Sequence, residues 1–411
     1  MIKKPELLAP AGSYEKAKIA FLYGADAVYM GTSSLSLRSR VSVDDEELEK
    51  TTKYAHSIQK KVYAAVNIYA WDENYQEVIR QAKLLEKLKV DGAIISDGGV
   101  VEVFKEYAPN VPINISTQAN IVSSHNANFW YHNGAKRVIL GRELNKEQIK
   151  EIIQETPDDL ETEIFIHGAI CFGYSGRCFL SDFLASRSAN LGDCAQSCRW
   201  AYNLYAEEKN NPGNLMPVED DEHGTYIFSS KDLCLIKELP EIINMGVDSL
   251  KIEGRLKTEY YLASVINTYR TAIDACLKNP QEYDYTDYLK ELEKTKTRGL
   301  TTFYFNDRKN KDFQEYEGKQ YNLEYEFGGK VMEYHQDKSI IEIRNKLSVG
   351  DTLEILIPGT INNYVFTIEK LWDTETDEEI NTVNPGKQGQ SVKIKLPIKC
   401  EKDWIIRRKK D

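Results

Sequence analysis

The sequence has no long apolar segment and lacks several signatures that would assign it to a common class of enzyme. Its apolar runs are too short to cross a bilayer, and its first residues, MIKKPELLAPAG, lack the apolar core of a signal peptide. We therefore expect a cytoplasmic protein without a membrane span. No H-E-x-x-H motif occurs, and no serine or threonine has a convincing base beside it. Both absences weaken a hydrolase interpretation.

Acidic residues also outnumber basic ones, 64 to 53. The formal net charge is −11, which argues against broad, nonspecific binding of nucleic acid. A local basic surface is still compatible with that value. The candidates for it are arginines in or beside predicted loops and the basic tail: Arg38, Arg40, Arg142, Arg177, Arg187, Arg199, Arg255 and Arg407–Lys410.

Short strand-like runs alternate with helical patterns through the first two thirds of the chain. The first helix shows both boundary signals, because Ser13 can cap its start and Gly24 can end it. The predicted strands cover 5–10, 27–30, 61–68, 92–96, 112–117, 136–141, 162–168 and 249–254. The predicted helices cover 13–24, 45–59, 75–88, 100–108, 125–132, 146–155, 232–245 and 259–277.

Eight strands that alternate with eight helices predict a closed (β/α)8 barrel, TIM-like in architecture. An open doubly wound sheet is the alternative, but no G-x-G-x-x-G follows the first strand, which weakens its dinucleotide-binding version. In such barrels the chemistry lies at the carboxyl ends of the strands. The polar residues predicted at those ends are Asn67, Ser116, Thr117, Gln118, Arg142, Glu143, His167 and Glu253.

The chain is predicted to have three parts. Residues 1–280 form the barrel, with a polar hairpin or excursion at 203–226, and residues 281–320 form a linker with some helix. Residues 321–411 change character to short strands separated by turn signals, which predicts a small antiparallel β-barrel domain. Domains of that kind bind nucleic acid, dock a partner or serve as structural appendages, and the sequence leaves these roles open.

Four of the seven cysteines lie in one glycine-containing stretch directly after the seventh predicted strand. They are spaced C-x6-C-x15-C-x3-C, and a reducing compartment makes a metal site more plausible for them than disulfides. Only the last pair resembles a zinc knuckle, so the unequal spacing favours an iron–sulfur cluster over zinc. The candidate ligands are Cys171, Cys178, Cys194 and Cys198, with Cys234 as an alternative to Cys198. Cys276 and Cys400 are expected to be packing residues.

A cysteine hydrolase remains an alternative for the same stretch. His167 precedes Cys171 by four residues and could serve as the base of a thiolate nucleophile. A single nucleophile, however, does not explain four clustered cysteines.

Several long strings in the chain resemble the peptidase U32 family. They are EIFIHGAIC (163–171), GRCFLS (176–181), PELLAPAG, ADAVYMG, STQAN (116–120), CAQSCRW, SSKDL and SLKIEGRLK. The family name records a protease assignment, whereas similar members hydroxylate RNA. One branch makes 5-hydroxyuridine at the wobble position of tRNA with prephenate, and a related branch hydroxylates a cytidine of ribosomal RNA. Another branch supports ubiquinone hydroxylation.

The resemblance implies a 4Fe–4S cluster on the cysteines named above, with prephenate as co-substrate and tRNA or rRNA as partner. Because prephenate carries two carboxylates, arginines near the barrel mouth are the expected clamp, with polar strand ends beside them. The candidates for substrate binding are Arg177, Arg187, Arg199, Arg255, Asn67 and Gln118. The candidates for catalysis are His167, Lys251 and Glu253, the last two pointing into the pocket from the final strand. A homo-oligomer or a hetero-oligomer with a paralogue is a further possibility, as is a peptidase or a noncatalytic RNA-binding protein.

Overall fold

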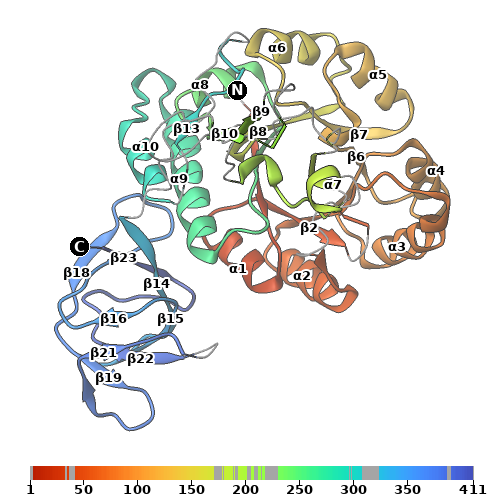
Figure 1. Cartoon of the computed structure of the whole chain (residues 1–411). Coiled ribbons are helices and arrows are strands. Elements are labelled where there is room, and N and C mark those ends of the chain that lie inside the picture. Colours follow the sequence, from red (N-terminus) through yellow and green to blue (C-terminus); the bar gives the residue numbers. More distant parts are fainter. Residues whose placement is uncertain are drawn as a thin grey trace. The chain divides into compact units, whose positions relative to one another are not determined.

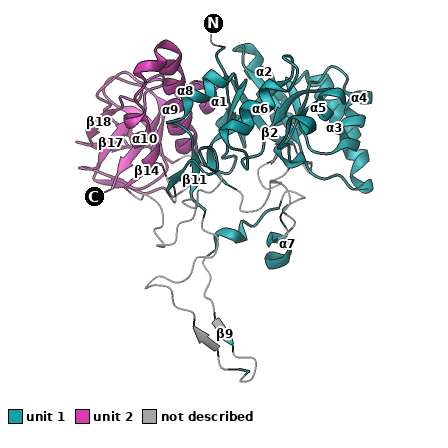
Figure 2. Cartoon of the chain, turned by 90° about the horizontal axis from the view of Figure 1, so that it is seen from above, with its two compact units in different colours: residues 1–17, 26–256, 297–320 teal, residues 18–25, 257–296, 321–411 magenta. Residues whose placement is uncertain are grey.

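The computed structural model describes most of the chain. It covers residues 3–32, 35–36, 42–170, 178, 180–187, 189, 193–200, 205–207, 212–213, 215–217, 230–295, 297, 299–307, 324–386 and 390–410. Contacts divide the chain into two compact units, which Figure 2 colours separately. Unit 1 comprises residues 1–17, 26–256 and 297–320, and unit 2 comprises residues 18–25, 257–296 and 321–411.

A closed parallel barrel forms the centre of unit 1. Its strands are β1 (Glu6–Pro10), β2 (Ala27–Thr32), β4 (Lys61–Val66), β5 (Gly92–Ile95), β6 (Ile113–Ile115), β7 (Ala135–Ile139), β8 (Glu161–Ala169) and β12 (Ser249–Ile252). Each strand pairs in parallel with the next, and β12 closes the ring by pairing with both β8 and β1. The predicted (β/α)8 barrel is therefore confirmed.

Helices follow the strands close to the positions that the sequence predicts, apart from the start of the helix predicted at 232–245. They are α1 (Tyr14–Leu22), α2 (Asp45–Ser57), α3 (Tyr75–Leu88), α4 (Gly98–Tyr107), α5 (Ser124–His132), α6 (Lys146–Gln154), α8 (Leu239–Met245) and α9 (Glu259–Lys278). Figure 1 shows α2 to α6 in an arc outside the strands. The Ser13 hydroxyl accepts a hydrogen bond from the Lys16 amide, and Gly24 adopts a φ of 103°, so both predicted boundary signals of the first helix are present.

Charged side chains fill the amino-terminal end of the barrel. Arg137 on β7 is 3% exposed and donates hydrogen bonds to Glu6, Glu161 and Glu163. Burial raises the pKa of Glu6, but Arg137 outweighs burial and holds that pKa below its ordinary value. The guanidinium therefore offsets part of the negative charge of three carboxylates, while Lys61 pairs with Glu6 and Lys251 pairs with Glu163.

One predicted helix begins too early. Residues 232–245 were expected to be helical throughout, whereas Asp232–Cys234 forms strand β11 and α8 begins at Leu239. β8 has nine residues and continues to Ala169, where β11 pairs with it antiparallel. β13 (Leu300–Thr301) then pairs with β11 in parallel. A partner strand contributed by a distant segment is not visible in the local periodicity of residues 232–245.

The polar excursion predicted at 203–226 contains a hairpin in its described part. β9 (Tyr205–Glu207) and β10 (Leu215–Pro217) pair antiparallel. Within residues 281–320, the structure describes the helix α10 (Thr286–Glu293), in line with the expected linker with some helix. The division by contacts groups α9 and α10 with the C-terminal strands, and the domain limits expected at residues 280 and 320 stay predictions.

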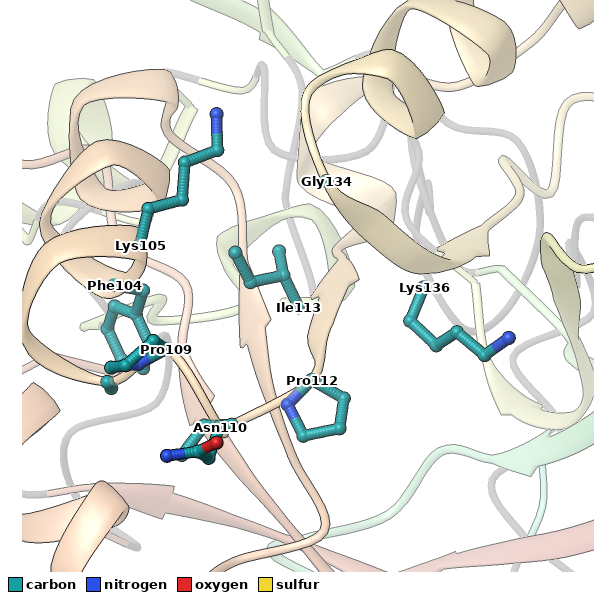
Figure 3. Close-up of a pocket in the computed structure, with 10 residues that line it drawn as sticks. Phe104, Lys105, Pro109, Asn110, Pro112, Ile113, Gly134 and Lys136 are labelled. Atoms are coloured by element: carbon teal, nitrogen blue, oxygen red, sulfur yellow. The ribbon is translucent and has the colours of Figure 1, made fainter.

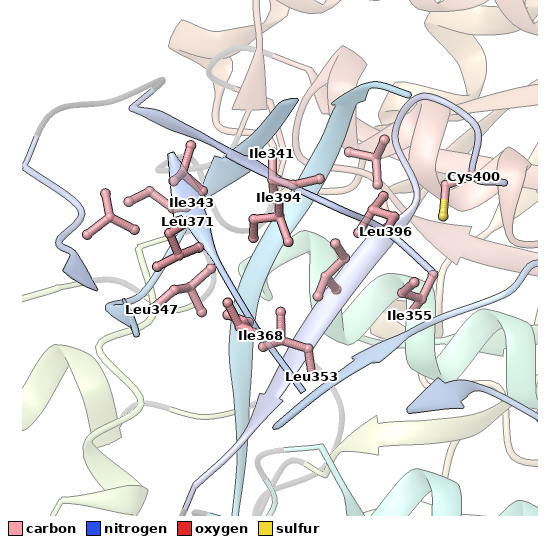
Figure 4. Packing of buried hydrophobic residues seen from close by; sticks show 14 residues of the cluster. Ile341, Ile343, Leu347, Leu353, Ile355, Ile368, Leu371, Ile394, Leu396 and Cys400 are labelled. Carbon is pink, nitrogen blue, oxygen red and sulfur yellow. The ribbon is translucent and has the colours of Figure 1, made fainter. Parts of the chain in front are cut away.

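An antiparallel half-barrel sheet forms the C-terminal part of unit 2. Its strands are β14 (Tyr325–Glu333), β15 (Ser339–Ile343), β17 (Thr352–Ile355), β18 (Tyr364–Thr367), β19 (Leu371–Asp373), β20 (Glu379–Ile380), β22 (Ser391–Ile394) and β23 (Ile405–Lys409). They lie in the order β18-β17-β23-β14-β15-β22-β19-β20, beside the pair β16 (Leu347–Ser348) and β21 (Thr382–Val383). Figure 4 shows the apolar cluster that these strands enclose, with Ile341, Leu353 and Ile394 almost fully buried.

The basic tail expected at residues 407–410 is not a free tail. Arg407 is 0% exposed in β23 and donates hydrogen bonds to Glu291 of α10 and Glu354 of β17. Arg408 pairs with Glu326 and Asp351. The expectation of an exposed basic RRKK segment is therefore wrong at its two arginines, because their charges are used to hold unit 2 together.

Candidate active site at the mouth of the barrel

A pocket of about 90 Å³ lies among residues at the carboxyl ends of the barrel strands. A single buried water needs roughly 10–15 Å³ on this scale, so the pocket has room for a small organic molecule. The residues that line it come from strands or strand ends around the ring: Tyr29, Ala65, Asn67, Ile94, Ser116, Thr117, Gln118, Ile139, Arg142, Phe165, Lys251, Glu253 and Arg255. This is the face on which barrels of this architecture carry their active sites.

Lys251 enters the pocket from β12, as the alternation along that strand predicts. Its ammonium donates a 2.8 Å hydrogen bond to Glu163 and lies 4.4 Å from the centroid of the Tyr29 ring. Burial lowers the pKa of Lys251 below its ordinary value, against the attraction of Glu163. Glu163 also accepts from Arg137, so the ammonium at the mouth is connected to the charged cluster at the base of the barrel.

Glu253 and Arg255 follow Lys251 at the same rim. The Glu253 carboxylate accepts a 3.3 Å hydrogen bond from the Tyr29 hydroxyl, and Arg255 donates a 2.6 Å bond to Ser36. A Cβ atom at Gly31 would lie 2.5 Å from the Arg255 Nη1 atom. The absence of a side chain at residue 31 therefore makes space for the Arg255 guanidinium.

Arg142 lies in the same pocket and was not among the predicted substrate ligands. Its Cζ atom is 3.7 Å from the centroid of the Phe165 ring, which places the guanidinium against an aromatic wall. The sequence marked Arg142 as a polar residue after the sixth strand and as a candidate for a local basic surface, but not as a substrate ligand. Its position at a strand end was the available signal, and the stacking on Phe165 requires the assembled barrel.

The amides predicted as substrate ligands line the opposite part of the pocket. Asn67 donates to the Ser116 hydroxyl at 3.4 Å. The backbone carbonyl of Gln118 accepts a 2.6 Å hydrogen bond from Tyr69, which holds this turn close to the end of β4. The structure thus brings Asn67, Gln118, Arg255, Lys251 and Glu253 together around one pocket.

His167 occupies a different position from the other predicted catalytic residues. It is 2% exposed on β8, opposite Ile252 of β12 on one side and Cys234 of β11 on the other. It is not one of the residues that line the mouth pocket in the described structure. A direct catalytic role for His167 stays a prediction.

The cysteine loop leaves β8 at this same end of the barrel. Cys171 and Arg177 lie outside the described residues, as do the basic-surface candidates Arg38 and Arg40. Cys178 and Cys198 are partly buried and Cys194 is exposed, whereas Cys234 is buried in β11. None of the described cysteines forms a disulfide, and Cys276 and Cys400 are buried as the packing prediction requires.

Hydrogen bonds connect the segments that carry the candidate ligands. The Ser181 hydroxyl, three residues after Cys178, accepts a 2.8 Å bond from the Ala195 amide next to Cys194. Arg199, next to Cys198, donates a 3.1 Å bond to the carbonyl of Ile170, the residue before Cys171.

These bonds connect described segments that flank the candidate cysteines, and the Gln196 amide donates a 3.4 Å hydrogen bond to the Cys194 sulfur. Amide hydrogen bonds to sulfur are a feature of iron–sulfur sites, so the donor types fit such a cluster. With Cys171 outside the description, no group of three or more His, Cys, Asp or Glu residues in the described part is placed to hold a metal.

The two described arginines of the loop are engaged with their own surroundings. Arg187 pairs with Asp193 at 2.7 Å, and Arg199 lies 3.9 Å from Asp232. Neither is among the residues that line the mouth pocket. A substrate role for either one stays a prediction, whereas their contacts show them ordering the cysteine loop.

A second hollow, of about 400 Å³, lies at the amino-terminal end of β6 (Figure 3). Lys105 and Lys136 are its cationic residues. Lys105 pairs with Glu102, and Lys136 donates to the carbonyl of Asp159. Both ammonium groups are thus engaged, and the hollow lies away from the strand ends where barrel chemistry occurs. We therefore place the candidate active site at the mouth pocket.

The closed barrel and its mouth pocket define a (β/α)8-barrel protein with a candidate active site at the carboxyl ends of its strands. Family models match the chain at residues 12–315, as peptidase family U32, and at residues 323–407, as the peptidase family U32 C-terminal domain. The chain belongs to the peptidase U32 family.

Curated relatives resemble the chain over nearly its whole length. It is 37% identical to tRNA hydroxylation protein P1 of Bacillus subtilis, over 99% of this chain and 96% of that protein. It is also 37% identical to tRNA hydroxylation protein P of Escherichia coli, over 98% and 96% respectively. The 23S rRNA 5-hydroxycytidine C2501 synthase of Escherichia coli is 31% identical over 92% of this chain and 58% of that protein.

In the described part of the chain, none of the helices combines the length and the apolar composition that crossing a membrane would require.

Proposed function

We propose that this protein is an RNA hydroxylase that converts the wobble uridine of tRNA to 5-hydroxyuridine. The observation that carries the proposal is the similarity, over nearly the full length of both chains, to two proteins named for tRNA hydroxylation. The mouth pocket supports it, because cationic side chains and apolar walls there suit a small organic co-substrate. Action in the cytoplasm, where tRNA is modified, is part of the proposal.

The redox group of the proposal is a 4Fe–4S cluster held by Cys171, Cys178, Cys194 and either Cys198 or Cys234. Such a cluster would supply one-electron transfer beside the mouth pocket. The chain's own contribution is to hold the cysteine segments together through the Ser181 and Arg199 hydrogen bonds. Anaerobically purified protein should be brown and contain about four iron atoms per chain. A colourless preparation that contains zinc in place of iron would contradict this part of the proposal.

Prephenate is the proposed co-substrate. The pocket would bind it through the positive charges at the mouth, while Lys251 and Glu253 lie close enough to the pocket to exchange protons with a bound molecule. Burial lowers the pKa of Lys251 below its ordinary value, which makes its proton easier to release.

Deleting the gene and analysing tRNA and rRNA nucleosides by mass spectrometry tests the function directly. We expect 5-hydroxyuridine and its derivatives to disappear from tRNA and to return when the wild-type gene is restored. An unchanged nucleoside profile would refute the proposal.

Hydroxylation of a cytidine in ribosomal RNA is the second candidate, favoured by the similarity to the 23S rRNA 5-hydroxycytidine synthase. Loss of hydroxycytidine from rRNA, with tRNA unchanged, would identify this activity. The peptidase of the family name is tested separately by gelatin hydrolysis, which an RNA hydroxylase should not catalyse. The oligomeric state, whether with itself or with a paralogue, stays a prediction that sedimentation can decide.

A further inference from the structure

Arg142 brings a positive charge into the mouth pocket, and the described part of the chain provides no ion pair or hydrogen bond for it. Its guanidinium is stacked on Phe165, with Cζ 3.7 Å from the ring centroid. Lys251 in the same pocket is instead paired with Glu163 at 2.8 Å. A stacked guanidinium directs its N–H groups outward in a plane, which suits bidentate hydrogen bonding to a carboxylate.

Gln118 also contributes a hydrogen-bond acceptor to the pocket that no described residue uses. The side-chain oxygen of Gln118 is enclosed and makes no hydrogen bond with any residue that the structure describes. An enclosed acceptor left without a donor is unfavourable, because it has lost water and gained no hydrogen bond in return. A ligand that carries a hydroxyl group would remove that cost.

The other residues that line the pocket indicate the chemical character of the rest of the ligand. Ile94 and Ile139 contribute buried apolar surface, at 3% and 1% exposure. Among the described lining residues, Arg142, Lys251 and Arg255 are cationic and Glu253 is the single carboxylate. The pocket therefore suits an organic anion with an apolar body.

We propose that Arg142 binds the carboxylate of a small organic anion in the mouth pocket, and that Gln118 accepts a hydrogen bond from a hydroxyl group of the same molecule. This inference rests on the proposed function and assigns the co-substrate's carboxylate to a specific residue. An RNA phosphate is the competing occupant of Arg142. The observations favour the small anion, because the guanidinium is stacked on the wall of a pocket of about 90 Å³ that Gln118, with its enclosed side-chain oxygen, also lines.

Isothermal titration of the anaerobically purified full-length protein with prephenate tests the proposal. Charge-assisted hydrogen bonds contribute about 1.5–3 kcal/mol, so Arg142→Gln should raise the Kd for prephenate about tenfold to a hundredfold. Arg142→Lys should bind with intermediate affinity, because it keeps the charge and loses the bidentate geometry. The matched control is Arg80→Gln, since Arg80 lies on α3 and pairs with Asp45 and Glu77. It should bind as the wild type does.

Two further measurements separate binding from folding and from RNA contact. All variants should keep the wild-type thermal transition, and Arg142→Gln should keep the wild-type affinity for tRNA in fluorescence anisotropy. In hydroxylation assays the KM for prephenate should rise while the KM for tRNA stays unchanged.

The proposal is overturned if wild-type protein does not bind prephenate or if Arg142→Gln binds it normally. It is also overturned if that variant loses tRNA affinity and keeps prephenate affinity, because Arg142 would then contact phosphate. Prephenate binding that depends on Arg142, in a protein that leaves tRNA unmodified, would refute the proposed function alone. Loss of tRNA hydroxylation on gene deletion, with normal prephenate binding by Arg142→Gln, would refute this inference alone.

Discussion

Gly31 shows how a single missing side chain positions a functional group. Its Cβ position would lie 2.5 Å from Arg255 Nη1 and 2.6 Å from the Ser36 hydroxyl, the two atoms that form one hydrogen bond. The Arg255 atom is at the end of a flexible side chain, so an added methyl group would displace the guanidinium more readily than the backbone.

Gly31→Ala should therefore impair binding more than stability. Loss of one charge-assisted hydrogen bond to the co-substrate costs about 1.5–3 kcal/mol, which corresponds to a KM about tenfold higher or more. Gly98→Ala is the control, because nothing lies within 4 Å of the added atom at the start of α4. Steady-state kinetics and thermal unfolding of both variants check this. Equal KM values for the two alanine variants would contradict the space-making role of Gly31.

Single residues also decide whether Cys198 or Cys234 is the fourth ligand of the proposed cluster. Arg199 ties the turn that contains Cys198 to Ile170, next to Cys171, whereas Cys234 lies buried in β11 opposite His167. We expect Cys198→Ser to lose most of its iron and Cys234→Ser to retain it. Iron analysis and the visible absorption of anaerobic preparations measure this. The reverse pattern would assign the fourth position to Cys234.

At the scale of elements, local periodicity predicted the strands and most helices because each of them has its own apolar pattern. KVYAAV and GAII are buried strands, and Ser13 and Gly24 mark helix ends that the structure confirms. The start of the helix predicted at 232 failed because Asp232–Cys234 pairs with the far end of β8. Likewise, the stacking of Arg142 on Phe165 joins the turn after β7 to β8, and no local pattern in the sequence contains it.

The cysteine loop is held by its own hydrogen bonds, and Ser181 is central to them. Its hydroxyl donates to the Arg187 carbonyl at 2.7 Å and accepts from the Ala195 amide at 2.8 Å. Ser181→Ala removes both bonds, at a cost of about 0.5–1.5 kcal/mol for each. We expect a lower iron content and faster loss of iron to a chelator, with an unchanged barrel.

Ser57→Ala is the matched control for this prediction. The Ser57 hydroxyl is exposed at the end of α2 and donates to the Tyr54 carbonyl. Iron release followed by absorbance should be the same in this variant as in the wild type. If Ser181→Ala released iron no faster than Ser57→Ala, the hydroxyl would not hold the loop.

Across the whole molecule, each unit contains a buried arginine surrounded by carboxylates. Arg137 serves this purpose in unit 1, and Arg407 does so in unit 2 with Glu291 and Glu354. Burial raises the pKa of Glu354, but Arg407 outweighs burial and lowers the pKa below its ordinary value of 4.5. Such a carboxylate stabilises the fold above pH 4.5, and its contribution is lost as the pH falls through the lowered value.

Arg407→Met should reverse the pH dependence that Glu354 gives to the stability of unit 2. Glu291 and Glu354 would lose the guanidinium and share Lys294 as their remaining cation, which costs up to about 3–5 kcal/mol at neutral pH. Without the guanidinium, only Lys294 opposes the effect of burial, so the pKa of Glu354 rises relative to the wild type and protonation relieves part of the penalty. The difference in stability between variant and wild type should therefore shrink as the pH falls from 7 toward 4.5. Hydrogen exchange in peptides from β14, β17 and β23 measures the effect where it arises.

An exposed ion pair in the same unit provides the control. Lys370→Met removes an ion pair with Glu379 in which both side chains are more than half exposed, so it should change exchange by at most about 1 kcal/mol at any pH. Peptides of the barrel strands should exchange normally in Arg407→Met, because Arg137 keeps its own carboxylates neutralised. A penalty in β23 that stayed constant with pH would show that Arg407 stabilises unit 2 by packing and not by pairing with Glu354.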